Sequence, residues 1–130
     1  MKKVVILGGG VGGTIVANLL TKKLRPDEAE ITLVDKTGKH VYQPGFVYVA
    51  FEHQKPGKLV RDERRLLKNR VKLVVGEAVK IDADGKSVHL ADGTILEYDR
   101  LVVALGARLT PDELPGYKGL RTTSTASKAP

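Results

Sequence analysis

Residues 4–35 of the chain read VVILGGGVGGTIVANLLTKKLRPDEAEITLVD. An apolar run leads into a glycine-rich segment, a helical pattern follows, and a second apolar run ends in Asp35. Gly8, Gly10 and Gly13 match the spacing G-x-G-x-x-G, and Asp35 follows about 20 residues later, as the dinucleotide-binding fingerprint requires. The glycines alone would also fit a turn in another βαβ protein. The whole series of strand, glycines, helix, strand and acid predicts a βαβ unit that binds a dinucleotide.

Each glycine of this segment has a separate physical role. Gly8 allows the tight turn out of the strand, Gly10 lets the backbone approach a pyrophosphate, and Gly13 lets the helix pack near the strand. The helix N-terminus directs free N–H groups and its positive dipole end toward the phosphates. Asp35 can accept hydrogen bonds from ribose hydroxyls and would repel a 2′-phosphate, which favours FAD or NAD over NADP.

The length and composition are those of one soluble domain. The chain has 130 residues, of which 42% are hydrophobic and 28% charged, and it has no cysteine. Disulfides, thiolate metal sites and a redox dithiol are therefore excluded within these residues. No apolar run is long enough to span a bilayer. The short run after Lys2 and Lys3 enters the glycine segment, so we interpret it as a strand and not a signal peptide, and we expect a cytoplasmic protein.

The positive charge of the chain is scattered along the sequence. The net charge is +7, and the densest group of cations lies between Arg61 and Lys72, where Asp62 and Glu63 interrupt it and no aromatic residue occurs. We interpret this group as the solvated side of a helix from Leu59 to Lys68, and we expect no nucleic-acid partner.

Apolar periodicity predicts three parallel strands and one long helix. A strand that is apolar throughout is covered on both faces of its sheet. The expected strands are Lys3 to Leu7, Ile31 to Val34 and Val71 to Val75. The expected helix is Val11 to Leu24, ended by Pro26. Its expected buried stripe consists of Val11, Ile15, Val16, Leu19 and Leu20.

The second half of the chain changes rhythm. Three short strands are expected at residues 78–81, 87–90 and 94–96, separated by Asp-Gly pairs that favour hairpins. The apolar run from Leu101 to Leu105 then returns to the parallel sheet and ends in Gly106, where open α/β sheets bind ligands. The fold class is therefore α/β, a Rossmann-like parallel sheet with flanking helices and an inserted antiparallel β-meander. We expect the domain to span residues 1–117 and residues 118–130 to form a flexible tail.

An aromatic segment follows the nucleotide unit. Residues 40–51 hold both phenylalanines and two of the four tyrosines of the chain, and Pro44-Gly45 breaks the segment in the middle. It could cover a flat ring system or pack in the core. We expect His40 and His53 to be surface or hydrogen-bonded residues and His89 to be structural, because no ligand partners stand at metal-binding spacing.

At four places the chain resembles a known family of flavoproteins. These are residues 8–13, Asp35, residues 40–51 and the segment YDRLVVALGAR at residues 98–108. Together they resemble the N-terminal FAD-binding part of the FAD-dependent pyridine nucleotide-disulfide oxidoreductases, over residues 1–117. Within this family the chain is most similar to sulfide:quinone oxidoreductase, with YQPGF at residues 42–46 as the most specific segment. Type II NADH dehydrogenases and flavocytochrome c sulfide dehydrogenases are relatives.

The resemblance implies an FAD site made by residues from several segments. Along the pyrophosphate it implies Gly8, Gly10, Val11 and Gly13. At the adenosine it implies Asp35 and Lys36 for the ribose and the backbone of Val79 for the adenine. Near the isoalloxazine it implies Gln43 and Pro44. Close to the pyrophosphate or the ribityl chain it implies Ala104, Leu105, Gly106 and Arg108.

This sequence departs from the family pattern in three ways. Leu105 stands where the family usually has a threonine, so one polar contact is missing. The cysteine pair at which the family oxidises sulfide, before FAD passes electrons to quinone at the membrane, is absent. The 130 residues end where the family would continue into a second nucleotide domain, a return segment and a membrane-binding region.

These departures shape the functional expectation. We expect an FAD-binding domain of a flavin-dependent oxidoreductase that is inactive alone and binds FAD weakly or not at all in isolation. A homo-oligomer or a partner chain would complete the flavin site, and a full-length form would be peripheral to the inner face of the membrane. The alternatives are an NAD-binding module and a non-catalytic truncated remnant.

Overall fold

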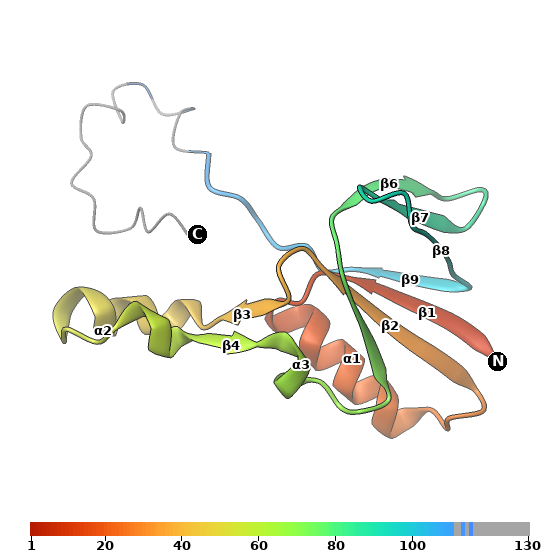
Figure 1. The fold of residues 1–130 in the computed structure, drawn as a ribbon, viewed down its shortest axis with the longest axis horizontal. Helices are drawn as coiled ribbons and strands as arrows, with labels where there is room; N and C mark the ends of the chain where they lie inside the picture. Colours follow the sequence, from red (N-terminus) through yellow and green to blue (C-terminus); the bar gives the residue numbers. More distant parts are fainter. Residues whose placement is uncertain (111–112, 114, 116–130) are drawn as a thin grey trace.

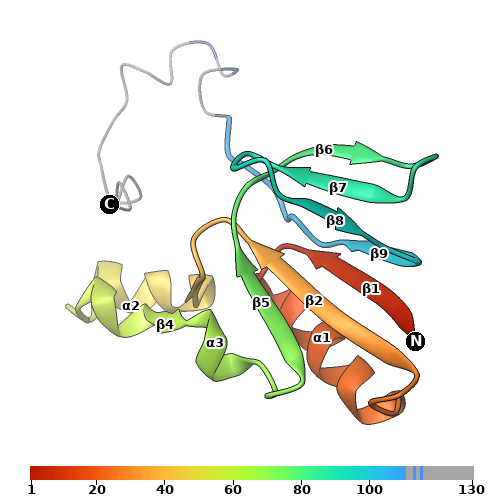
Figure 2. The same ribbon diagram turned by 45° about the vertical axis from the view of Figure 1, so that its right-hand side comes forward.

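A parallel sheet forms the centre of the computed structural model, which describes residues 1–110, 113 and 115. Its strands are β1 (Lys2–Leu7), β2 (Ala29–Asp35), β5 (Val71–Val75) and β9 (Arg100–Val103). They lie side by side in the order β5-β2-β1-β9, and every pair is parallel (Figures 1 and 2). The chain moves outward from β1 to β5 and then returns to the other side of β1. The strand order therefore reverses at the carboxyl ends of β1 and β9, which is where such sheets bind ligands.

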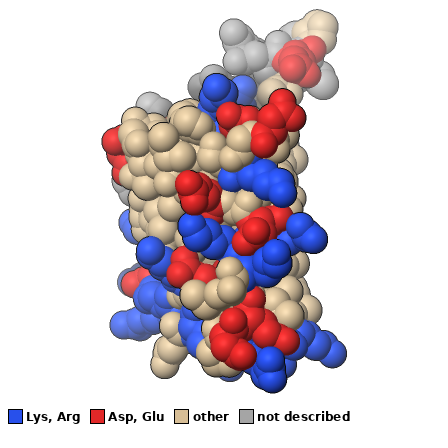
Figure 3. Space-filling model, turned by 90° about the vertical axis from the view of Figure 1, so that its right-hand side faces the viewer, with Lys and Arg blue, Asp and Glu red and all other residues tan. Residues whose placement is uncertain are grey.

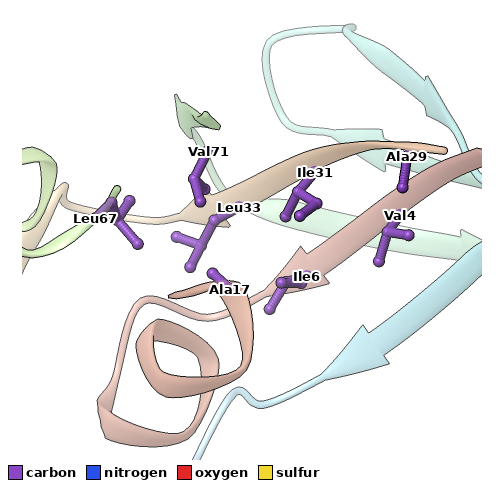
Figure 4. Close-up of a cluster of buried hydrophobic side chains, with 8 residues drawn as sticks. All are labelled: Val4, Ile6, Ala17, Ala29, Ile31, Leu33, Leu67 and Val71. Carbon is purple, nitrogen blue, oxygen red and sulfur yellow. The ribbon is translucent and has the colours of Figure 1, made fainter. Parts of the chain in front are cut away.

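Side chains of β1 alternate between two apolar clusters on opposite faces of the sheet. Val4 and Ile6 pack with Ala17 of helix α1 (Val11–Lys23) in the first cluster (Figure 4). Val5 and Leu7 belong to the second cluster on the other face. The predicted strand, apolar throughout and covered on both faces, is confirmed. Side chains of β1 contribute to the apolar clusters on both faces of the sheet.

Helix α1 has the predicted extent, and Val16 and Leu20 of the predicted stripe pack against the first cluster, but the rest of the stripe faces away from the sheet. Val11, Ile15 and Leu19 are exposed to 58%, 52% and 49%, so the predicted buried stripe is wrong at these three positions. The buried residues are Gly13 and Ala17, together with a threonine between them. Small side chains let the helix axis lie close to the sheet, so size and not hydrophobicity alone selects the contacting face.

An outer arm, residues 39–62, follows β2 and precedes β5 in the sequence, and it extends away from the sheet (Figure 1). It contains β3 (Lys39–Val41), the 3-10 turn η1 (Gln43–Gly45), α2 (Phe46–Phe51), a second 3-10 turn η2 (Pro56–Leu59) and β4 (Val60–Asp62). The aromatic segment lies on this arm, and Phe51 is 80% exposed. Among the described residues, the arm's aromatic rings are thus not part of either buried cluster.

The predicted helix from Leu59 to Lys68 is mostly wrong. Helix α3 covers only Glu63–Leu66, because β4 pairs antiparallel with β3 just before it. Asp62 ends the strand and caps α3, its carboxylate accepting the Arg64 backbone N–H at 2.9 Å. Backbone pairing to a segment about 20 residues away overrides the local helical preference.

The interpretation of the charged segment as a solvated face is also only partly right. Glu63 is fully buried. The Arg70 guanidinium donates to the carbonyl oxygens of Thr21 at 2.9 Å and Leu24 at 2.8 Å, at the C-terminus of α1. A cation there satisfies carbonyl groups that the helix leaves free. On the face shown in Figure 3, positive and negative side chains are intermingled.

The antiparallel meander forms as predicted and covers the second face of the sheet. Its strands are β6 (Ala78–Asp82), β7 (Ser87–Leu90) and β8 (Ile95–Glu97), in the order β6-β7-β8. Val88 and Leu90 of β7 contribute to the second cluster. The backbone N–H of Lys3 donates to Asp99 at 2.7 Å, which lowers the pKa of that carboxyl and joins the meander's end to β1.

The Rossmann-like α/β fold with an inserted meander is therefore confirmed. None of the helices in the described part of the chain is long and apolar enough to cross a membrane. The predicted tail at residues 118–130 and the domain boundary at residue 117 lie outside the described residues.

Candidate dinucleotide-binding site

The turn after β1 fits tightly between its neighbouring strands. The backbone N–H of Gly8 donates to the Val34 carbonyl at 2.8 Å, and the N–H of Ala104 donates to the Leu7 carbonyl at 2.8 Å. Gly8 has a φ of +103°, and a Cβ built on it would overlap the carbonyl oxygen of Ala104. Only glycine combines this backbone angle with this close approach.

Gly13 brings the first turn of α1 against the turn after β1, which comprises residues 8–10 and is called the glycine bend below. A Cβ built on Gly13 would overlap the carbonyl oxygen of Gly8. The predicted role of Gly13, close packing of helix on strand, is therefore visible in the structure. It fixes where the helix N-terminus stands relative to the end of β1.

Gly10 differs from these two glycines because open space surrounds it. A Cβ built on Gly10 would meet nothing within 4 Å. Gly10 is also the N-cap of α1, with no side-chain cap and no acidic residue in the first turn. The helix N-terminus thus presents N–H groups to an open cradle without a carboxylate of its own, which suits an anionic group such as a diphosphate.

Asp35, at the end of β2, is engaged with the protein's own backbone. Its Oδ1 accepts the Gly9 N–H at 2.9 Å, and its Oδ2 accepts the N–H groups of Thr37 at 3.0 Å and Gly38 at 2.7 Å. A carboxylate has about four acceptor positions, so Oδ1 keeps one for a further donor. Asp35 therefore holds the glycine bend and the following turn, and it still has capacity for a sugar hydroxyl.

Lys36 and Val79 are both connected with the link between β5 and β6. The Lys36 ammonium pairs with Glu77 in this link at 3.0 Å. Val79 follows Glu77 by two residues, lies in β6 and is 61% exposed. Both residues are on the surface, and the ammonium of Lys36 is engaged with this carboxylate.

The segment after β9 runs past the glycine bend. Ala104 contacts Gly8, as described above, and Leu105 is 63% exposed. Gly106 has a φ of +70° with open space around its Cα, and Arg108 is exposed. Ala104 borders the cradle directly, while Arg108 lies where the chain leaves the sheet.

Gln43 and Pro44 are among the predicted site residues that the structure does not bring to the bend. They form η1 on the outer arm, which points away from the meander (Figures 1 and 2). Within the described residues, no hydrogen bond joins either of them to residues 8–13. The structure thus gathers Gly8, Gly10, Val11, Gly13, Asp35 and Ala104 at one place.

A buried polar cluster lies beneath the bend, and the sequence did not predict it. Glu63 is fully buried, and its two carboxylate oxygens contact Thr14 Oγ1 at 2.6 Å and His40 Nδ1 at 3.1 Å. His40 Nδ1 also lies 2.9 Å from the Gly9 carbonyl oxygen. The expectation of a hydrogen-bonded His40 is confirmed. No periodic pattern in the sequence marks a single buried carboxylate in a basic segment.

The glycine bend does not coincide with the open hollow of the structure or with a metal site. An open hollow between Gly38, Arg61 and Leu73 lies beside the outer arm and β5, not at the glycine bend. Among residues 1–110, 113 and 115, no group of His, Asp or Glu side chains could hold a metal ion.

Comparison with known proteins shows the family of this chain. Residues 2–129 match the profile of the pyridine nucleotide-disulphide oxidoreductase family, and the chain belongs to this family. A type II NADH:quinone oxidoreductase of Staphylococcus epidermidis is 38% identical over 107 residues, which are 81% of this chain and 26% of the relative. The chain therefore spans about a quarter of the length of the curated relatives it matches.

Solved structures agree with this assignment. The sulfide:quinone oxidoreductase of Aquifex aeolicus superposes with a TM-score of 0.73 at 31% identity, over 85% of this chain and 25% of that one. A NAD-dependent persulfide reductase of A. fulgidus gives a TM-score of 0.70 at 28% identity, over 84% and 22%. The resemblance to sulfide:quinone oxidoreductase stated from the sequence is confirmed.

Proposed function

We propose that this chain forms the FAD-binding part of a flavin-dependent oxidoreductase that resembles sulfide:quinone oxidoreductase. The observation that carries the proposal is the open cradle at Gly10. It stands at the N-terminus of α1, at the point where the strand order reverses, and beside the carboxylate of Asp35. A diphosphate between two sugars needs this combination of bare backbone, helix N-terminus and adjacent acid.

The residues of the chain would divide the work of holding FAD. The N–H groups at Val11 and the next residue would meet the diphosphate, and Asp35 Oδ1 would accept from the ribose with its remaining acceptor position. Lys36 and the backbone of Val79 would stand at the adenosine end, and Ala104 to Gly106 would border the ribityl chain. Bound FAD would supply hydride or electron-pair chemistry, and the protein positions it.

The ring end of the flavin is the less complete end of the proposed site. Gln43 and Pro44 lie on the outer arm, and the helix α2 that follows them exposes apolar residues such as Phe51. We infer that a second chain or a further segment covers this end, that FAD binds weakly without it, and that the chain alone does not turn over substrate. Cytoplasmic placement, with contact to the inner membrane face only through such further sequence, belongs to the same proposal.

An NAD-binding module is the second candidate, because the glycine bend with Asp35 would accept NAD as well as FAD. The meander and the Ala-Leu-Gly segment after β9 favour FAD over NAD. A remnant that binds neither nucleotide is the third candidate, since the chain has no redox cysteine.

Thermal unfolding with added nucleotides separates the three candidates. The purified chain is melted with FAD or with NAD at rising concentrations into the millimolar range, and flavin absorbance is followed after gel filtration. A ligand at 100 times its Kd stabilises the native state by about 2.7 kcal/mol. A shift with FAD alone is the expected result. A shift with NAD alone, or with neither, contradicts the FAD assignment, and tightly bound stoichiometric flavin contradicts the weak-binding part.

A methyl group placed in the cradle gives a sharper result. Gly10→Ala should leave the melting temperature without ligand nearly unchanged, because the new Cβ meets nothing within 4 Å. It should raise the Kd for FAD roughly tenfold or more, since the methyl takes the space of the diphosphate. Gly57→Ala is the matched control, because its Cβ also meets open space but lies on the outer arm. Equal FAD affinity in both variants would move the ligand away from Gly10.

A further inference from the structure

The buried carboxylate of Glu63 joins three separate parts of the fold. Glu63 belongs to α3, Thr14 to α1 and His40 to β3, and the side chains meet beneath the glycine bend. Taking an ionised carboxylate out of water is costly unless hydrogen bonds compensate it. Both oxygens of Glu63 have such a partner, at 2.6 Å from Thr14 and 3.1 Å from His40.

The positions of the hydrogens follow from the acceptors. The Gly9 carbonyl can only accept, so His40 Nδ1, 2.9 Å away, carries a proton. This single proton is shared between the Gly9 carbonyl oxygen and the Glu63 carboxylate oxygen, which lies 3.1 Å from the same nitrogen. The Thr14 hydroxyl has one proton. It lies 3.2 Å from the Gly9 carbonyl and 2.6 Å from Glu63, and the shorter distance fits donation to the carboxylate. Glu63 therefore orients both groups that line the Gly9 carbonyl.

The Gly9 peptide is thereby held from two sides. Its N–H donates to Asp35 at 2.9 Å, and its carbonyl accepts from His40. A Cβ on Gly9 would come within 2.9 Å of the Asp35 carboxylate, so no side chain could help to fix this residue. Consecutive glycines lose more backbone freedom on ordering than any other residues. Glu63, His40 and Thr14 together form a clamp on Gly9. This clamp acts at the place where the chain would otherwise be least constrained.

We infer that Glu63 is a positioning residue, which holds the Gly9–Gly10 backbone in its binding conformation through His40 and Thr14. The identity of the bound group, a flavin diphosphate, rests on the proposed function; the clamp on Gly9 does not. Ordering the bend before the ligand arrives removes an entropy cost from binding. Because His40 lies on β3, the same contact also ties the base of the outer arm to the bend.

Hydrogen exchange of single amides tests the clamp without any ligand. The exchange rate of the Gly9 N–H is measured by NMR in the full chain and divided by that of Ile6 in β1, which corrects for changes in global stability. Glu63→Gln keeps the size of the side chain but places an NH₂ group among donors. It should raise the ratio roughly tenfold or more. Val88→Ala, a cavity in the meander's cluster, is the control that should leave the ratio unchanged.

A second pair of variants keeps the test decisive if Glu63→Gln does not fold. Thr14→Ser retains the hydroxyl and should behave as the wild type. Thr14→Val keeps the shape, removes the donor to Glu63 and should raise the ratio. An unchanged Gly9 ratio in Glu63→Gln and Thr14→Val overturns the inference.

Titration with FAD then connects the clamp to binding. If the wild type binds, Glu63→Gln and Thr14→Val should raise the Kd, and Thr14→Ser should not. Wild-type affinity in the two clamp variants would overturn the inference as it concerns binding. If the wild type binds no FAD, the proposed function fails, and the amide ratios alone support or overturn the clamp.

Discussion

Gly13→Ala should destabilise the chain by about 3 kcal/mol or more, a large part of the 5–15 kcal/mol typical of a domain. The added Cβ would overlap the Gly8 carbonyl oxygen, which is backbone and cannot rotate away. Relief requires α1 to move off β1, which opens the cluster of Ile6 and Ala17. Urea unfolding followed by circular dichroism measures the change.

Gly12→Ala is the neighbouring control for this experiment. Its Cβ would lie 3.9 Å from the Ala104 Cβ, an ordinary contact. Alanine is also favoured over glycine within a helix by about 1 kcal/mol. We expect Gly12→Ala to be neutral or stabilising. Equal stabilities of the two variants would mean that α1 does not approach β1 as closely as described.

Asp35→Ala should weaken the fold and the proposed FAD site together. The loss of the carboxylate leaves the N–H groups of Gly9 and Gly38 without their acceptor. We expect a destabilisation of about 2 kcal/mol, because hydrogen bonds to charged groups contribute about 1.5–3 kcal/mol and water partly replaces them here. The Kd for FAD should rise roughly tenfold or more.

Two further variants separate these two effects. Asp35→Asn keeps one side-chain oxygen and should fall between wild type and alanine in stability. Asp27→Ala removes an exposed carboxylate near Arg25, remote from the bend, and should change stability by less than about 0.5 kcal/mol. An unchanged FAD affinity in Asp35→Ala, measured by flavin fluorescence, would remove Asp35 from the ribose site.

The sequence predicted those parts of the fold that depend on local pattern. The continuous apolar runs of β1, β2 and β5 can each be recognised from a few neighbouring residues. The same holds for the Asp-Gly turns of the meander. The glycine spacing likewise predicted the bend, because Gly13 is required by the Gly8 carbonyl only five residues away. The contact that requires glycine at position 8, with the Ala104 carbonyl, appears only in the folded sheet.

The parts that the sequence did not predict depend on distant partners. Val11, Ile15 and Leu19 look like a buried stripe, but Gly13 and Ala17 determine which face of α1 reaches the sheet. The pairing of β4 with β3 replaced a helix that the charged sequence favours by itself.

The candidate site shows the same division. The motif predicts Asp35 as a ribose acceptor, but its bonds to Gly9 and Gly38 form only when the turn after β2 is folded. The sequence pattern indicates Glu63 only as an interruption of a basic surface. Its burial arises because α3, α1 and β3 meet beneath the bend, and no spacing in the sequence records that meeting.

The position of β1 between β2 and β9 has a consequence for how the protein is made. Val4 pairs with Ile31 on one side and with Arg100 on the other. A ribosome adds about 5–20 residues per second, so the second edge of β1 waits on the order of ten seconds for its partner to be synthesised. During translation the apolar strand β1 can therefore pair along one edge only until residues 100–103 have been synthesised.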